Sequence, residues 1–330
     1  MIKEKNIWFI TWMQIVGCLL VIIGHSYPFI LPIPLWAEKL RSFIYDFHMP
    51  LFVWCSGYLL IATGTIEKYS FLDYIKRRIM HLIVPYILFS LLGIIPKLLL
   101  SSVLNDKFEV TDLIRVFLVP RESIWGHFWF LPMIFVLGLI GYGIIKIKLR
   151  YFRNTYVYDF TFIAVGAVAY FVPRLTDWLS INDIVHYFIY LYLGIFCGTR
   201  KLVDFHSALI SVCCFLFSIL LFYAMDNSNV AQLLISLLML YVVFYISQVL
   251  SNIVHIDRES IFAQTYSIFI LSWPCQLVVE IILERLLKFS FYITFPCEIL
   301  IGIIAPLLII KIIDLLEKKI HMNISLMIGR

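Results

Sequence analysis

The chain has 330 residues, of which 62% are hydrophobic and only 14% are charged. A soluble protein of this length carries roughly a quarter charged residues, so the composition excludes the ordinary soluble classes and predicts an integral membrane protein. The formal net charge of +5 does not indicate a nucleic-acid partner, because no basic patch alternates with aromatic residues in a polar context.

Apolar runs of about 20 residues, the length of a membrane-spanning helix, predict an all-α protein with about ten spans. None of the runs shows the two-residue alternation of a transmembrane strand. Neither an internal repeat nor a low-complexity linker divides the chain, so we expect a single transmembrane domain over residues 1–330. The predicted spans cover residues 8–27, 48–64, 82–104, 128–147, 156–173, 184–199, 207–225, 230–250, 264–285 and 292–314.

The first run follows Lys3 and Lys5, as a secretory signal would. It is long for a signal peptide, and no small-residue cleavage site follows it, which favours a retained helix. With the N-terminus inside, most of the 26 lysines and arginines fall on cytoplasmic segments. An even number of spans agrees with this count, so both termini are predicted to be cytoplasmic and residues 105–127 external.

The seven cysteines all lie in apolar runs and lack the spacing of metal ligands. We interpret them as reduced packing residues and expect neither a disulfide framework nor a metal site. They are Cys18, Cys55, Cys197, Cys213, Cys214, Cys275 and Cys297.

His25 ends the first run, in the string Gly24-His25-Ser26. An ionisable side chain at membrane depth is costly to bury and is a functional-site hypothesis by default. Gln14 lies eleven residues earlier, about 20° past three full helical turns, so it shares a face with His25, Cys18 and Val21. Such a stripe suits a channel for a long, thin substrate. The alternative is that His25 lies at the outer headgroup level and Gln14 bonds to a neighbouring helix.

A second histidine, His48, opens the second predicted span from the same external side. It can approach His25 after the 28–47 connection, although an interfacial histidine is the simpler interpretation. Pro50 suits the first turn of a helix, where its missing N–H costs nothing. Gly57 allows another helix or a substrate to come close to the backbone.

The cluster Lys76-Arg77-Arg78, with His81 one turn later, has three interpretations. It is a topology signal, a contact for anionic lipid headgroups, or a phosphate clamp, since arginine presents a planar fork to phosphate oxygens. The string Trp129-Phe130-Leu131-Pro132 is equally explained by an interfacial aromatic belt.

Taken in order, these strings resemble the membrane acyltransferase family 3. The resemblance extends over most of the chain and is to the standalone members that acylate surface polysaccharides, in the manner of a fucose O-acetylase. Those members lack an appended SGNH hydrolase-like domain, and no segment here is long enough to form one. The strings are Gly24-His25-Ser26, His48-Met49-Pro50-Leu51-Phe52, Ser56-Gly57-Tyr58, Lys76-Arg77-Arg78 before Pro85-Tyr86, Trp129-Phe130-Leu131-Pro132 and the segment 266–276.

The resemblance implies an O-acyltransferase, with acetyl-CoA or another acyl-CoA as donor, that modifies a hydroxyl of a glycan or lipid-linked sugar at the bacterial inner membrane. It implies no metal and no nucleic acid, and it implies contacts with membrane lipids and with polysaccharide-biosynthesis proteins. It makes His25 the catalytic histidine, with His48 beside it. The predicted donor- and substrate-binding residues are Gln14, Tyr58, Arg77, Arg78, Trp129 and Gln276.

Two positions depart from the family pattern. Family members usually carry Arg or Lys at the position of Gln14 and a basic residue, commonly Arg, at the position of His81. Loss of a fixed positive charge weakens the attraction for an anionic donor, so the mode of donor binding stays open. The rival hypotheses are an exporter or flippase of a polysaccharide intermediate, for which an internal repeat is expected, and a structural partner of a polysaccharide synthase.

Overall fold

The computed structural model describes residues 8–27, 31–99, 109–123, 125–152, 155–202, 207–225, 228–256, 260–320 and 325–329. Within these ranges the regular elements are helices, and no strand occurs among them. The all-α class predicted from the apolar runs is therefore confirmed for the described part of the chain.

The chain forms two compact units, each with its own packed interior. The boundary between the units falls within one long helix, α2 (Leu35–Ala62), whose first part belongs to one unit and whose last part belongs to the other. The first unit consists of Met1–Cys55 and Leu202–Ser325, and the second of Ser56–Lys201 and Leu326–Arg330.

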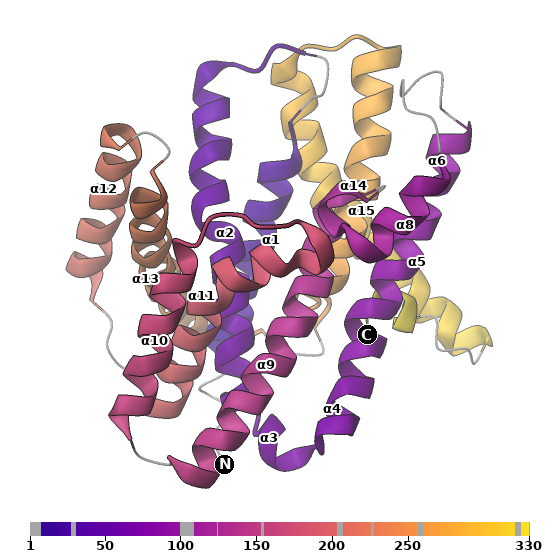
Figure 1. Cartoon of the computed structure of the whole chain (residues 1–330). Helices are drawn as coiled ribbons and strands as arrows, with labels where there is room; N and C mark the ends of the chain where they lie inside the picture. Colours follow the sequence, from indigo (N-terminus) through magenta and orange to yellow (C-terminus); the bar gives the residue numbers. More distant parts are fainter. Residues whose placement is uncertain are drawn as a thin grey trace. The chain divides into compact units, whose positions relative to one another are not determined.

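In the first unit, the N-terminal helix α1 packs against α13 and α14, and the later helices form the pairs α12 with α13 and α14 with α15 (Figure 1). Ser228 caps the start of α13 by accepting a hydrogen bond from the Ala231 N–H at 3.1 Å, which satisfies one of the free amide groups there. The helices are α1 (Trp8–His25), α12 (Ala208–Ala224), α13 (Asn229–Ile253), α14 (Thr265–Glu280) with the π-helical turn η7 (Ile281–Leu286), and α15 (Phe291–Ile320).

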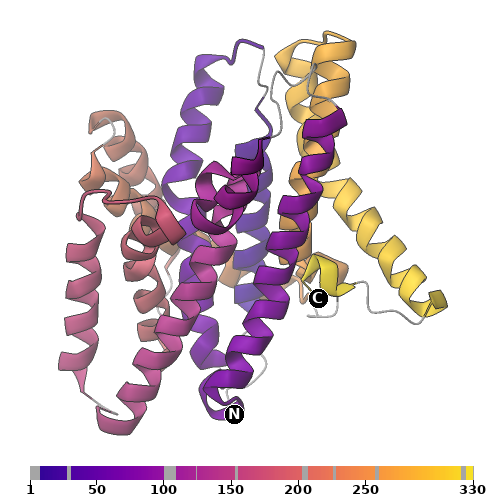
Figure 2. The ribbon, with the colours of Figure 1, turned by 45° about the vertical axis from the view of Figure 1, so that its right-hand side comes forward.

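In the second unit, α10 and α11 lie side by side in both views, and α9 also packs on α11 (Figures 1 and 2). Gly57 of α2 is needed for this packing, since a side chain there would overlap the backbone carbonyl of Leu191. The close helix approach predicted at Gly57 is thus confirmed. The longer helices are α4 (Phe71–Arg78), α5 (Val84–Leu92), α6 (Ile94–Leu99), α8 (Val110–Leu118), α9 (Phe130–Tyr151), α10 (Tyr156–Tyr170) and α11 (Ile181–Arg200).

Short helical turns complete both units. The π-helical turn η2 joins α4 to α5 without a break in the chain direction, and Ser70 caps α4 by accepting from the Asp73 N–H at 3.2 Å. The remaining turns are α3 (Thr65–Lys68), η2 (Ile79–Ile83), η3 (Pro120–Glu122), η4 (Gly126–Trp129), η5 (Trp178–Ser180), η6 (Ile261–Ala263) and η8 (Ser325–Ile328).

A buried ionic cluster joins α9, α10 and α11. The carboxylate of Asp159, which has no exposed surface, accepts from Lys148 Nζ, from Arg200 Nη2 at 2.6 Å and from Tyr192 Oη at 2.9 Å. We call these four residues the Asp159 cluster. A buried carboxylate is tolerated only with such partners, and here each partner comes from a helix neighbouring α10, so the cluster fixes the three helices together.

Seven helical segments of the described chain are long and apolar enough to cross a membrane, and the multi-pass character is therefore clear. The helices α10 and α12 are apolar but shorter. The predicted span 82–104 divides at Gly93 into α5 and α6, and its last residues lie outside the described ranges. The count of ten spans and the cytoplasmic placement of the termini stay predictions. The seven segments are Trp8–His25, Leu35–Ala62, Gly126–Tyr151, Trp178–Arg200, Asn229–Ile253, Thr265–Leu286 and Phe291–Lys319.

The second predicted span, 48–64, begins too late. Helix α2 starts at Leu35, so Pro50 lies inside the helix instead of in its first turn, and His48 lies in the middle instead of at the external end. Proline inside a helix removes one backbone hydrogen bond, and neighbouring helices make this tolerable in membrane proteins. The proline and the polar residues before it hid the N-terminal half of the helix from a prediction based on hydropathy.

Candidate active site

The C-terminal end of α1 brings His25 against two aromatic rings of the first unit. The ring centroid of His25 lies 5.2 Å from that of Trp273 on α14 and 6.1 Å from that of Tyr45 on α2. The Tyr45 ring is in turn 5.1 Å from the ring of His48. Tyr45 therefore packs beside both histidines that the sequence singled out. We call His25, Tyr45, His48 and Trp273, with Gln276, the histidine cluster.

Gly24 explains how α2 comes so close to α1. The Tyr45 hydroxyl donates a hydrogen bond to the Gly24 carbonyl at 2.8 Å. A Cβ atom at position 24 would lie only 2.8 Å from Cε1 of Tyr45, so a larger residue would push the ring away. The glycine before His25 thus serves to position Tyr45 next to the histidine.

His48 is held in one orientation by its own helix. Its Nδ1 lies 2.8 Å from the Ile44 carbonyl oxygen, and the side chain is only 6% exposed. Because a carbonyl only accepts, the hydrogen is assigned to Nδ1, which leaves Nε2 of the neutral ring with a free lone pair. Such a ring can accept a proton or a hydrogen bond from a substrate hydroxyl.

Gln276 on α14 holds the end of α1 on both sides of the catalytic candidate. Its Nε2 donates to the Ile22 carbonyl at 3.0 Å and to Ser26 Oγ at 2.7 Å, and Ser26 Oγ itself donates to Ile22 O at 2.8 Å. Gln276 is 2% exposed, and its Oε1 is buried without a hydrogen-bond partner. Gly302 of α15 leaves room for it, since a Cβ there would lie 3.0 Å from Cδ of Gln276. Gln276 and His25 therefore belong to one site.

The predicted stripe below His25 is partly closed by packing. Gln14 and His25 both lie on α1 and are half-buried, but Cys18 between them is buried, with its Sγ 3.6 Å from the Thr265 carbonyl. This contact attaches that part of α1 to the start of α14. A channel along the stripe stays a prediction that would need α1 and α14 to separate at Cys18.

The two arginines of the predicted phosphate clamp differ in what they contact within the second unit. Arg78 Nη2 donates to the Ile134 carbonyl of α9 at 2.5 Å, and a Cβ on Gly138 would lie 2.6 Å from the same nitrogen. Arg77 is exposed, with its guanidinium carbon 4.4 Å from the centroid of the Tyr69 ring. Arg78 therefore joins α4 to α9, whereas Arg77 presents its fork on the surface.

Two further predicted binding residues lie in the second unit. Tyr58 is buried in the last part of α2, with 2% of its surface exposed. Trp129 lies under the guanidinium of Arg121, at 3.7 Å from Cζ to the ring centroid. Arg121 also donates to both carboxylate oxygens of Asp183, at 2.8 and 2.7 Å. This bidentate pair holds Trp129 in place by its rigid geometry.

The structure thus assembles part of the predicted site. It brings His25, His48 and Gln276 together in the first unit, and it places Tyr58, Arg77, Arg78 and Trp129 in the second. The sequence reasoning missed Tyr45, whose only signal was its position one turn before His48. It also missed Trp273 as a neighbour of His25, although Trp273 lies in one of the quoted strings. Among the described residues, no group of three or more His, Cys, Asp or Glu side chains is arranged to hold a metal ion.

Comparison with known proteins agrees with the resemblance found in the strings. Residues 7–314 match the family described as an acyltransferase domain. A segment of 120 residues is 32% identical to the Nodulation protein NolL of Mesorhizobium japonicum. That segment covers 36% of this chain and 30% of the NolL sequence, so the likeness is to less than a third of the relative's length. No solved structure matches the chain.

Proposed function

This chain belongs to the membrane acyltransferase family 3, and from that premise we propose that it moves an acyl group, acetyl in the simplest case, from acyl-CoA to a hydroxyl of a cell-surface glycan or lipid-linked sugar. The observation that carries the proposal is the histidine cluster at the end of α1. Two imidazoles, a phenol and an amide meet there within one unit. Neither a metal nor a covalent enzyme intermediate is needed for the transfer that these groups support.

The transfer forms one ester bond and breaks one thioester bond. The sugar hydroxyl attacks the thioester carbonyl carbon, His25 accepts the hydroxyl proton, and the same proton passes to the departing thiolate to give free CoA. A neutral imidazole suits both steps, because its pKa in water lies near the operating pH. The lone pair on Nε2 of His48 can accept a hydrogen bond from a neighbouring hydroxyl of the same sugar and so orient the acceptor.

The donor is anionic, and Arg77 is the exposed residue best suited to its phosphates. Its guanidinium can form paired, charge-assisted hydrogen bonds with phosphate oxygens, while stacking on Tyr69 keeps the side chain extended. In the orientation predicted from the charge distribution, Arg77 faces the cytoplasm, where acyl-CoA is available. We place the protein in the bacterial inner membrane, beside the proteins that build the polysaccharide.

The test is release of free CoA thiol by the purified full-length protein, supplied with acetyl-CoA and a glycan acceptor. His25→Ala is expected to lower turnover by roughly 10²–10⁴-fold, the usual contribution of a positioned proton-transfer group. His48→Ala is expected to cost less, because that ring orients rather than transfers. His255→Ala, which removes an exposed histidine of the same unit, is the matched control. Export of glycan without consumption of acetyl-CoA, unchanged in His25→Ala, would instead identify a transporter.

A further inference from the structure

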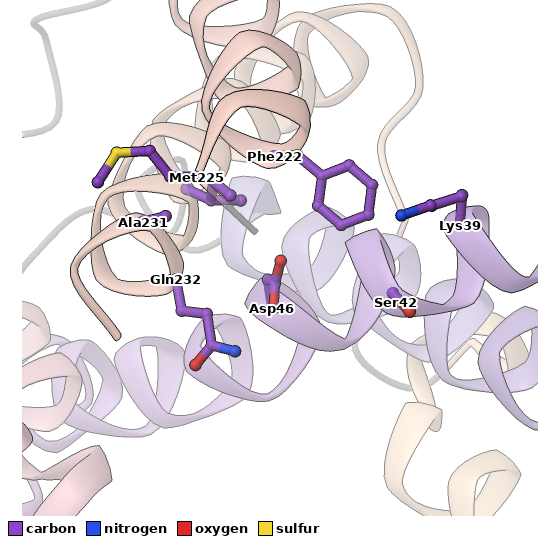
Figure 3. Close-up of a pocket in the computed structure, with 8 residues that line it drawn as sticks. Lys39, Ser42, Asp46, Phe222, Met225, Ala231 and Gln232 are labelled. Carbon is purple, nitrogen blue, oxygen red and sulfur yellow. The ribbon is translucent and has the colours of Figure 1, made fainter. Parts of the chain in front are cut away.

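A pocket with four polar side chains lies beside α2, on a face next to the one that carries Tyr45 and His48. The space between its lining residues is partly open to the surroundings, so the pocket is a groove on the helices and not an enclosed cavity. Figure 3 shows the carboxylate of Asp46 near its middle, with Gln232 to one side and Ser42 and Lys39 to the other. Phe222 of α12 contributes an aromatic wall. All of these residues belong to the first unit.

The spacing of residues along α2 explains why the pocket and the histidine cluster are separate. Lys39, Ser42 and Asp46 recur three and four residues apart, so they share one helical face. Tyr45 and His48 lie three residues apart on another face, toward α1. Ser42 and Tyr45 are also three residues apart, so the two sites lie on adjacent faces of one helix.

The polar groups of the pocket are available to a ligand. No ion pair joins Lys39 to Asp46 among the residues that the structure describes. Lys39 Nζ lies instead 5.7 Å from the centroid of the Phe222 ring. A half-buried carboxylate without a cationic partner favours a ligand that donates hydrogen bonds to it.

The side chains indicate the chemistry of that ligand. Asp46 only accepts hydrogen bonds, Lys39 only donates them, and Ser42 and Gln232 do both. One positive and one negative charge disfavour a ligand with a strong net charge of either sign. The negative face of the Phe222 ring attracts weakly positive C–H groups, such as those on one face of a pyranose. The combination matches a neutral ligand rich in hydroxyl groups.

We propose that this pocket is a carbohydrate subsite, which holds a sugar of the acceptor glycan next to the sugar that is acylated at the histidine cluster. This assignment rests on the proposed function. The subsite gives the enzyme a preference for an oligosaccharide over a single sugar. In the predicted orientation the pocket faces outward, since it lies at the connection between α12 and α13 and near the start of α2.

The test compares two acceptors prepared from the surface polysaccharide of cells that lack this protein: an oligosaccharide and its methyl monosaccharide. With full-length protein in detergent, Asp46→Asn is expected to raise the KM for the oligosaccharide roughly 10- to 100-fold, the effect of losing a hydrogen bond to a charged group. Gln232→Ala and Phe222→Leu are expected to raise it severalfold. The KM for the monosaccharide and the kcat are expected to stay unchanged in all three variants.

Two matched control variants distinguish an effect on the pocket from a nonspecific effect of losing a carboxylate or an aromatic ring. Glu38→Gln removes an exposed carboxylate of α2 outside the pocket, and Phe217→Leu removes an exposed ring of α12. Both are expected to behave as wild type with either acceptor. If Asp46→Asn and Gln232→Ala also match wild type with the oligosaccharide, the subsite assignment is wrong, while acyl transfer by the wild-type protein still supports the proposed function.

Direct binding keeps the two proposals distinguishable. Calorimetric titration of the oligosaccharide without donor is expected to show binding that Asp46→Asn weakens by the same factor, even if the wild-type protein transfers no acyl group. Stabilisation by phosphatidylethanolamine vesicles that depends on Asp46, without any oligosaccharide binding, would overturn the carbohydrate assignment in favour of a zwitterionic lipid headgroup.

Discussion

The histidine cluster and the Asp159 cluster both place polar groups among apolar helices, but the groups are paired differently. The carboxylate of Asp159 accepts hydrogen bonds from Lys148, Tyr192 and Arg200. In the histidine cluster, Tyr45 and His48 donate their hydrogen bonds to backbone carbonyls, and acceptor atoms such as Nε2 of His48 remain for a substrate. An ion whose hydrogen bonds are all made within the protein can stabilise the fold. Neutral groups with remaining lone pairs can instead bind a substrate or accept a proton from it.

The largest expected effect tests whether the Asp159 cluster stabilises the fold. Asp159→Asn removes the charge that Lys148 and Arg200 share, leaving buried cations without their partner. Breaking a buried pair in this way costs on the order of 3–5 kcal/mol of stability. We expect a large fall in Tm in detergent, measured by thermal unfolding, with normal KM values in the protein that remains folded.

Glu67→Gln, an exposed carboxylate of the same unit, controls for the loss of charge alone and is expected to leave Tm unchanged. If Asp159→Asn instead lowered kcat at an unchanged Tm, the Asp159 cluster would belong with the chemical groups and the comparison would fail.

The next effect separates two adjacent arginines. Arg77→Ala is expected to raise the KM for acetyl-CoA roughly 10- to 100-fold per lost phosphate contact, because such a contact contributes about 1.5–3 kcal/mol to binding, with little change in Tm. Arg78→Ala is expected to lower Tm, because Arg78 is bonded to the α9 carbonyl of Ile134. For both variants, steady-state kinetics with acetyl-CoA measures the KM and thermal unfolding measures the Tm. Equal, purely structural effects of the two changes would favour the topology-signal interpretation of the basic cluster.

A smaller effect is expected within the histidine cluster. Tyr45→Phe keeps the ring beside His25 and His48 but removes the hydrogen bond to Gly24, a contribution of about 1 kcal/mol. We expect turnover to fall severalfold, because the ring that orients both histidines becomes less fixed. Tyr223→Phe, at an exposed position of α12, is the matched control. An unchanged kcat in Tyr45→Phe would remove Tyr45 from the site.

The smallest effect concerns the stripe on α1. If acyl-CoA reaches His25 past Gln14, Gln14→Arg is expected to preserve or modestly lower the KM for the donor, because an added positive charge attracts phosphates. The donor KM, measured at increasing ionic strength, should then rise more steeply in the variant than in wild type, because salt screens the added attraction. A raised donor KM in Gln14→Arg would indicate that the donor does not follow this stripe.

The sequence alone determined the class and the family of this protein, because membrane helices obey a strong local rule. With no water to satisfy the backbone, apolar runs of about 20 residues fold as helices, which determines the class and most of the elements. His25 was identified for the same reason, since an ionisable group in such a run is costly. The family followed from the order of the short strings along the chain.

Only the tertiary structure decided which residues meet. Helix α2 begins at Leu35 because packing and helix propensity outweigh the polar residues that hydropathy assigns to a loop. Its longer course places Tyr45 beside both histidines and directs Asp46 into a pocket with Gln232. These contacts join segments that are far apart in the chain and depend on side-chain shape, as the close approach at Gly24 illustrates. The local pattern of apolar and polar residues does not predict such contacts. The sequence therefore identified the candidate groups, and the packing of the helices decided which residues lie beside them.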